Sequence, residues 1–329
     1  MRIGIVTPAP PRSPQGNRTT ALRWARLLRT LGHRVAVKQS FSGENWDLLI
    51  ALHARRSAAS VTRFHKEYPQ RPRIVALTGT DLHLDLPRGN LAAQRSLKLA
   101  TRLVALHADA ADALPRAVRA KLQVIYQSVT VPAWTAAAAS ARRTRSIGDA
   151  KNFEVFVVGH LRPVKDPFRA AMAVRRLPSS SRIQVAHFGV ALSESMRRRA
   201  LQESERNDRY RWHGHVSHAK LLQALRRRAA LLVQTSRAEG GPHTISEACV
   251  AGVPVLATDI PGSTGLLGRD YPGLFPVGDT ARLRELLQRA EGDRAFYRAL
   301  AQWCRRQAKL FDPERELASW RRLLGELQG

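Results

Sequence analysis

Short runs of β-branched and apolar residues alternate with helix-like runs through the N-terminal half of the chain. Residues 2–7 are predicted to form a strand, and residues 19–31 an amphipathic helix with apolar residues at helical spacing. Gly32 ends this helix, and residues 33–37 return as a second strand. Further strands are predicted at residues 47–52, 73–78, 102–106 and 122–125. Repeated strand–helix units predict a parallel sheet covered by helices on both faces.

The alternation breaks at residues 132–151, which are rich in alanine and arginine, and restarts at residue 153. Later strands are predicted at residues 153–158, 183–188, 230–234 and 254–258, and the chain from residue 280 is almost entirely helical. We therefore predict an α/β protein with two doubly wound, Rossmann-like domains and a C-terminal helical tail. The predicted parts are an N-terminal domain at 1–132, a linker at 133–151, a second domain at 152–311, and a helix at 312–329 that packs back toward the N-terminal domain.

Length and composition agree with two globular domains. The chain has 329 residues, 44% of them hydrophobic, which favours two domains over one. Its two cysteines, Cys249 and Cys304, are far apart and predict neither a disulfide framework nor a zinc cluster. The N-terminus shows no secretory pattern, and no apolar run approaches the roughly 20 residues of a bilayer span. We expect a cytoplasmic protein without stable membrane insertion.

The formal net charge of +28 leaves several functions open. Nucleic acid, an anionic membrane surface and small anionic substrates would each suit a basic protein. The excess is mostly arginine, spread along the whole chain, and its short runs lie in helical patterns without neighbouring aromatic residues. Solvated helix faces account for most of these residues, so charge alone does not select a function.

The loop after the first predicted strand is a candidate anion site. It ends with Gly16, Asn17 and Arg18, directly before a predicted helix. Ligands of parallel sheets bind at the carboxyl ends of strands, and a helix N-terminus favours an anion, to which Arg18 adds a charged fork. The alternative is a proline-rich loop in which Asn17 or Thr19 caps the helix.

The strand at residues 73–78 ends in small polar residues and an acid. These residues are Thr78, Gly79, Thr80 and Asp81. Their position predicts a substrate site, and the alternative is that Asp81 caps the helix that follows.

Two cations follow the first strand of the second half. Gly159, Arg162 and Lys165 lie just past residues 153–158, on a predicted turn. Two positive charges three residues apart suit a diphosphate whose charge grows as it leaves, although two exposed surface cations would give the same pattern.

A glycine-rich segment with two glutamates follows the strand at 230–234. Glu239 and Glu247 are separated by seven residues, and between them lie Gly240, Gly241, Pro242, His243 and Thr244. The glycines can expose backbone N–H groups, and a helix starting near Thr244 directs its positive end to the same space. Glu247 could accept hydrogen bonds from ribose hydroxyls, and the alternative is an acid that stabilises its own helix dipole.

The ordered set of motifs resembles the retaining glycosyltransferases of family 4, which have the GT-B fold. The matching residues are Gly159, Arg162, Lys165, Gly214, Glu239, Gly240, Gly241, Pro242, Glu247, Ala248, Gly252, Val253, Pro254 and Val255. The resemblance implies that the second domain binds a nucleotide sugar. It implies that Arg162 and Lys165 hold the diphosphate, that Glu239 lies near the sugar, and that Glu247 lies near the ribose. It further implies no cofactor and no divalent metal, and the Asp-x-Asp triad of metal-using glycosyltransferases is absent.

One departure from that family concerns the acceptor. Family 4 enzymes commonly have a His-Gly pair where this chain has Thr78-Gly79. A histidine would help deprotonate an acceptor hydroxyl, so its absence favours an acceptor that is already an anion. Residues 7–10, 16–18, 21–25, 51–57 and 77–82 resemble the selenosugar synthases of selenoneine biosynthesis.

This second resemblance implies selenophosphate as acceptor, UDP-N-acetylglucosamine or UDP-glucose as donor, and formation of a carbon–selenium bond. The candidate acceptor cations are Arg18, Arg55 and Arg56, with His53 as a possible hydrogen-bond donor. The alternative for Arg55 and Arg56 is a surface pair at a helix start. A family 4 enzyme acting on a lipid or saccharide hydroxyl remains the alternative function, and an arginine-rich nucleic-acid-binding protein remains a third.

The remaining histidines indicate no metal site. His213, His215 and His218 are close in sequence, but they flank the predicted turn at Gly214 and have no cysteine or acid partner at ligand spacing. We therefore predict that the protein holds no metal.

Overall fold

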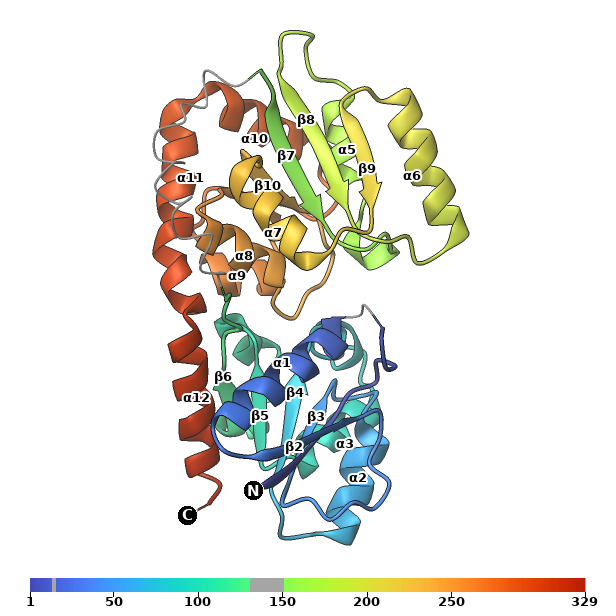
Figure 1. Cartoon of the computed structure of the whole chain (residues 1–329), viewed down its shortest axis with the longest axis vertical. Helices are drawn as coiled ribbons and strands as arrows, with labels where there is room; N and C mark the ends of the chain where they lie inside the picture. Colours follow the sequence, from blue (N-terminus) through green and yellow to red (C-terminus); the bar gives the residue numbers. More distant parts are fainter. Residues whose placement is uncertain (14–15, 131–150, 329) are drawn as a thin grey trace. The chain divides into compact units, whose positions relative to one another are not determined.

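The computed structural model describes residues 1–13, 16–130 and 151–328, in two compact units (Figure 1). The first unit comprises Met1–Gln127, Ala238–Gly241 and Pro313–Gly329, and the second comprises Ser128–Arg237 and Pro242–Asp312. The predicted linker at 133–151 lies outside the described residues except for its last position.

The first unit is built on a six-stranded parallel sheet of order β2-β1-β3-β4-β5-β6. Its strands are β1 (Arg2–Val6), β2 (Arg34–Lys38), β3 (Leu48–Leu52), β4 (Arg73–Leu77), β5 (Arg102–Ala105) and β6 (Leu122–Val124). Its helices are α1 (Gly16–Thr30), α2 (Ala58–Glu67), α3 (Leu91–Leu99) and α12 (Pro313–Gly325). The central strands β3 and β4 are buried at every position, as expected for a parallel sheet covered on both faces.

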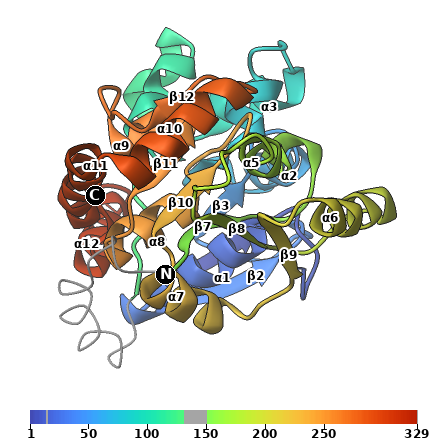
Figure 2. The same ribbon diagram turned by 90° about the horizontal axis from the view of Figure 1, so that it is seen from above.

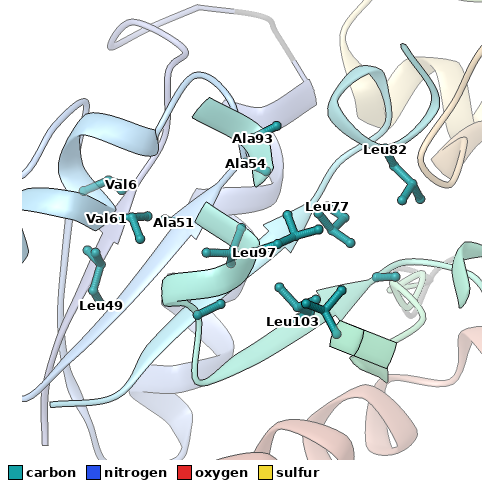
Figure 3. Close-up of a cluster of buried hydrophobic side chains, with 14 of the residues drawn as sticks. Val6, Leu49, Ala51, Ala54, Val61, Leu77, Leu82, Ala93, Leu97 and Leu103 are labelled. Atoms are coloured by element: carbon teal, nitrogen blue, oxygen red, sulfur yellow. The ribbon is translucent and has the colours of Figure 1, made fainter. Parts of the chain in front are cut away.

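Alternation along β1 sends side chains into two separate cores. Ile3 and Ile5 join a cluster with α1 and α12, whereas Val6 joins the cluster under α2 and α3. In Figure 3, Val61 of α2 and Leu97 of α3 lie over the strand side chains of this second cluster. Helices therefore cover both faces of the sheet, which confirms the doubly wound prediction.

The last helix, α12, is part of the first core. Trp320 packs edge-on against Trp24 of α1, with ring centroids 4.9 Å apart. Glu316, which is buried, accepts hydrogen bonds from the Trp24 indole N–H and the Arg23 guanidinium. A buried carboxylate needs such partners, so these bonds fix how α12 packs on α1.

The second unit repeats the plan with a six-stranded parallel sheet of order β12-β11-β10-β7-β8-β9. The strands are β7 (Phe153–Val158), β8 (Ile183–Phe188), β9 (Tyr210–Gly214), β10 (Leu231–Gln234), β11 (Val255–Thr258) and β12 (Leu274–Phe275). The helices are α5 (Arg169–Val174), α6 (Glu194–Arg206), α7 (His218–Arg227), α8 (His243–Ala251), α9 (Pro261–Leu267), α10 (Thr280–Gly292) and α11 (Arg294–Gln307).

Helices pack around this second sheet in the same way. The short helix α5 packs against β8, and α6 lies beside the edge strand β9, as Figures 1 and 2 both show. Helix α8 contacts both α7 and α11. Among the helices of the described ranges, none combines the length and apolar character needed to span a bilayer.

Candidate functional site

The loop after β7 presents two cations on a short turn. Residues Pro163–Lys165 form a 3-10 turn in which the Lys165 N–H donates to the Arg162 carbonyl at 3.0 Å. Arg162 is exposed, and the Lys165 side chain passes close to Gly159, where a Cβ would lie 3.8 Å from Lys165 Cδ. Two cations placed together at the carboxyl end of a parallel strand can bind a group with several negative charges.

Backbone contacts hold this turn in place. The Thr235 hydroxyl, just after β10, lies 3.0 Å from the carbonyl oxygens of both Lys165 and Asp166. The Arg237 N–H donates to the Val164 carbonyl at 2.8 Å. Thr235 was missed by the sequence reasoning, although a threonine directly after a predicted strand is a signal for such a role.

A buried histidine fixes the end of β7. His187 Nε2 lies 3.1 Å from the Gly159 carbonyl, and Nδ1 lies 2.9 Å from the Tyr210 hydroxyl. Burial lowers the pKa of His187 to about 4, so the ring is neutral at pH 7. A carbonyl only accepts, so Nε2 carries the proton and Nδ1 accepts from the tyrosine.

Glu247 lies inside the first turns of α8 and receives two imidazoles. Its Oε1 is 2.6 Å from His218 Nε2 and 2.9 Å from His243 Nδ1. His243 Nε2 lies 3.2 Å from the Ser128 carbonyl. Burial raises the pKa of Glu247, but hydrogen bonds from the two histidines outweigh it and bring the pKa down to about 2. Glu247 is therefore an ionised carboxylate, and it gives His218 an acid partner 29 residues away in the sequence, outside ligand spacing.

The segment before α8 belongs to the first unit, where it contacts the loop after β4. A Cβ on Gly240 would lie 2.3 Å from the Thr78 carbonyl carbon, and one on Gly241 would lie 2.8 Å from Leu106 Cβ. The backbone of Gly79, at φ +130°, is equally close, because a Cβ there would lie 2.6 Å from Gly240 N. Only glycine fits these positions, so the segment's glycines are required by packing as well as by any ligand.

Two stacked histidines lie beside this segment and were missed by the sequence reasoning. The rings of His83 and His107 are 5.6 Å apart at an interplanar angle of 21°. Burial lowers the pKa of both, to about 4 for His107, while the neighbouring Asp81 and Glu239 carboxylates act in the opposite direction on His83. No local pattern links these two positions, so the sequence offered no signal for them.

Asp81 shapes the loops of the first unit from a fully buried position. Its carboxylate accepts from the backbone N–H groups of Ala54, Thr78, Gly79 and Leu82, at 2.8–3.1 Å. The side chain thereby ties the loop after β3 to the loop after β4. Most of these N–H groups precede the helix that starts at Asp81, so the carboxylate joins two loops rather than capping that helix.

His53 joins the same two loops. It is buried, adopts φ +73°, and places Nε2 3.0 Å from the Thr80 hydroxyl, while the Arg56 N–H lies 3.4 Å from Nδ1. Burial lowers the pKa of His53, against the raising effect of Asp81. Arg55 pairs with Asp85 at 2.8 Å, and both Arg55 and Arg56 are exposed.

Arg18 lies in the first turn of α1, after β1. Within the described residues, its Nε is buried and has no hydrogen-bond partner. A buried guanidinium N–H is costly to leave unsatisfied, and an anion at the start of α1 would supply the missing acceptor. Strands β1, β3 and β4 are neighbours in a parallel sheet. Arg18, Arg55, Arg56 and Thr78 come directly after these strands, so they all lie on the side of the sheet where the strands have their carboxyl ends.

Most of the predicted donor-side residues lie in the second unit. The set there comprises Gly159, Arg162, Lys165, Pro242, His243, Thr244 and Glu247, of which Pro242 is the N-cap of α8 and His243 and Thr244 are its first residues. Glu239, Gly240 and Gly241 belong to the first unit. The acceptor-side candidates all lie in the first unit: Gly16, Asn17, Arg18, His53, Arg55, Arg56, Thr78, Gly79, Thr80 and Asp81.

A family model described as glycosyl transferases group 1 matches residues 142–309, just over half of the chain. No curated protein matches the chain.

Solved structures similar to this chain cover nearly its whole length. HepE of Anabaena, in complex with UDP, has a TM-score of 0.74 at 18% identity, over 99% of this chain and 100% of HepE. Sucrose-phosphate synthase of Thermosynechococcus elongatus has a TM-score of 0.77 at 16% identity, over 99% of each chain. The lipopolysaccharide outer core galactosyltransferase WaaB, in its apo form, has a TM-score of 0.68 at 13% identity, over 99% of each chain. These similarities confirm the expected GT-B fold.

Proposed function

The chain belongs to the group 1 glycosyltransferases, and on this basis we propose that it transfers a hexose from a UDP-sugar to selenophosphate, as a selenosugar synthase does. Membership of this family makes the chain an enzyme rather than an arginine-rich nucleic-acid-binding protein. The donor sugar in the proposal is UDP-N-acetylglucosamine or UDP-glucose.

The donor half of the proposal rests on the second unit. The anchored turn that carries Arg162 and Lys165 suits a diphosphate, and the ionised Glu247 suits ribose hydroxyls, which donate to it. Thr244, in the first turn of α8, adds the positive end of a helix. HepE, which shares the fold, has been solved with UDP and with UDP-glucose.

The acceptor half rests on one observation above the others: the buried Arg18 Nε at the start of α1. A small multivalent anion would satisfy that N–H and the helix N-terminus together. The exposed Arg56, after β3, adds positive charge at the same carboxyl-end side of the sheet. Thr78 stands where related enzymes commonly have a histidine, and an anionic nucleophile needs no base there.

The proposed step is a substitution at the anomeric carbon. A selenium lone pair forms the C–Se bond while the bond from that carbon to the UDP oxygen breaks, and UDP leaves with the electron pair. Arg162 and Lys165 act on the charge that develops on the leaving diphosphate, whereas Glu239 lies near the sugar. The first product is a selenium-linked glycosyl phosphate, and water then cleaves its P–Se bond to give the selenosugar and phosphate.

The test is a mass-spectrometric screen of purified protein, in which each UDP-sugar is combined with selenophosphate, thiophosphate or phosphate. We expect a product mass containing selenium and hexose, formed together with UDP. Turnover of UDP-sugars with sugar or lipid hydroxyls, but not with selenophosphate, would overturn the acceptor proposal and leave the family assignment intact.

A further inference from the structure

Two histidines converge on Glu247 from different elements of the second unit. His243 and Glu247 are four residues apart on α8 and therefore share one face of that helix, while His218 is the first residue of α7. Their ligand atoms, together with those of Glu247, all lie within 4.8 Å of one another. We refer to His218, His243 and Glu247 as the imidazole–carboxylate cluster.

The contacts of His243 direct its Nδ1 toward the Glu247 carboxylate. Its Nε2 faces the Ser128 carbonyl at 3.2 Å, and a carbonyl oxygen can only accept, so Nε2 carries a proton. Nδ1 faces the Glu247 carboxylate 2.9 Å away, a position that either a proton or a metal ion bound to both atoms can occupy.

We propose that the imidazole–carboxylate cluster binds a divalent transition metal of the Zn²⁺ class through His218 Nε2, His243 Nδ1 and the Glu247 carboxylate. Two histidines and one glutamate are a common zinc ligand set, which leaves a further position for water. The contact of His243 Nε2 with a backbone carbonyl is the usual outer partner of a metal-bound imidazole, and it leaves Nδ1 as the ligand.

The cluster can reach metal geometry by a small movement. Neighbouring ligand atoms on a tetrahedral zinc lie about 3.3 Å apart, given bond lengths of roughly 2.0–2.2 Å, compared with 2.6 and 2.9 Å in the cluster. The His218 side chain is 65% exposed, so it can move outward by the roughly 0.7 Å required, and the His243–Glu247 separation has to widen by roughly 0.4 Å. Imidazole ligands favour Zn²⁺, Cu²⁺ and Ni²⁺, whereas Mg²⁺ prefers oxygen ligands.

The metal would have a consequence for the donor, and this part rests on the proposed function. Glu247 is the carboxylate proposed to accept hydrogen bonds from the ribose of UDP. A carboxylate that coordinates a metal cannot also receive those hydroxyls in the same way, so metal and UDP compete. The reaction itself needs no metal in this scheme, and a transition metal inhibits it by occupying Glu247.

The direct test uses Co²⁺ absorption spectra and Zn²⁺ calorimetry on the full chain after chelator treatment, with no nucleotide present. We expect one equivalent of metal, visible Co²⁺ bands, and no comparable binding of Mg²⁺. His218→Ala removes an exposed ligand without touching the core, and it should weaken metal binding by more than the roughly 10- to 100-fold cost of losing an outer partner. His215→Ala is the matched control, since His215 is exposed and lies outside the cluster.

Failure of the wild-type chain to bind Co²⁺ or Zn²⁺ would overturn the metal site, as would unchanged binding in both His218→Ala and His243→Ala.

The competition is tested by UDP titration with chelator and with Zn²⁺. The wild type should bind UDP more weakly in the presence of Zn²⁺, and Zn²⁺ should weaken UDP binding less in His218→Ala. If the wild-type protein, treated with chelator, does not bind UDP, the proposed function is overturned while the Co²⁺ result is unaffected. The two failures are therefore distinguishable.

Discussion

At the scale of single residues, the side chains that carry charge on the turn after β7 differ from the groups that hold its backbone in place. Thr235 and the Arg237 N–H bind backbone atoms of the turn, while the side chains of Arg162 and Lys165 extend from it. Removing either charge should therefore leave the turn's backbone intact.

Arg162→Ala and Lys165→Ala should each lower kcat far more than they change donor KM. Their proposed partner, the leaving diphosphate, gains charge in the transition state, so the loss should be roughly 10²–10³-fold in kcat. Steady-state kinetics with the preferred UDP-sugar measures both constants. Arg176→Ala, an exposed arginine after α5, is the matched control and should behave as the wild type. Equal losses in all three variants would count against the assignment.

Arg18→Ala tests the acceptor side in the same manner. Loss of a charge-assisted hydrogen bond costs about 1.5–3 kcal/mol, which corresponds to roughly a 10- to 100-fold rise in acceptor KM. Binding of UDP, measured by calorimetry, should stay near the wild-type value. Arg26→Ala, exposed on the same helix, serves as control. If Arg18→Ala weakened UDP binding as much as acceptor use, its place on the acceptor side would be wrong.

At the scale of elements, loops at the carboxyl ends of neighbouring strands are joined by buried polar groups. Asp81 ties the loop after β3 to the loop after β4, and Gly240 lets the segment before α8 lie against that second loop, while Gly241 lies against Leu106 after β5. The arrangement depends on backbone contacts that no side-chain pattern records.

Gly240→Ala should therefore reduce stability and activity together. The added Cβ would meet backbone atoms of Thr78, which cannot move aside as a flexible side chain does, and such overpacking costs about 1–3 kcal/mol. We expect Tm to fall by roughly 2–4 °C per kcal/mol in thermal unfolding. Gly292→Ala is the control, because a Cβ there meets nothing within 4 Å. A Gly240→Ala protein with wild-type Tm and turnover would show that this close approach is not needed.

The helices and strands also differed in how clearly the sequence pattern predicted them. The prediction did not include β9 and β12. Strand β9 lies at the sheet edge, alternates buried with more exposed positions and carries arginine and histidine, while β12 is only two residues long. Edge strands bury less apolar surface, so their sequences carry weaker patterns than the central strands do.

At the scale of the whole molecule, each unit buries a histidine whose neutral form the fold prefers. Burial lowers the pKa of His107 in the first unit and of His187 in the second to about 4, from about 6.5 in an unfolded chain. Both histidines bind more protons when unfolded, so their contribution is complete above pH 6.5 and is lost as the pH falls toward 4.

The free energy of unfolding should consequently fall between pH 6.5 and 4, by up to roughly 3.4 kcal/mol for each histidine. His107→Leu should flatten this dependence, because both ring nitrogens of His107 lack a partner within the described chain and leucine fills a similar volume. Denaturant unfolding at several pH values measures it, with the exposed His215→Leu as control. An unchanged slope in His107→Leu would contradict the role given to His107.

The sequence by itself determined the two doubly wound sheets, the helical end of the chain, and the position of Arg162, Lys165 and Glu247 next to strand ends or helix starts. These follow from local periodicity, because hydrophobic spacing and turn residues act over a few neighbours. The same local reasoning placed Arg18 at the start of a helix.

Only the tertiary structure decided which distant side chains meet. His218 reaches Glu247 across 29 residues, Asp81 turns inward to backbone N–H groups from two loops, and His83 stacks on His107. Such contacts depend on strand order and on how helices cross the sheet, which residue spacing does not encode. The prediction of no metal considered only histidines that are close together in the sequence. The residues of the imidazole–carboxylate cluster come from two different helices, so their spacing in the chain did not reveal them.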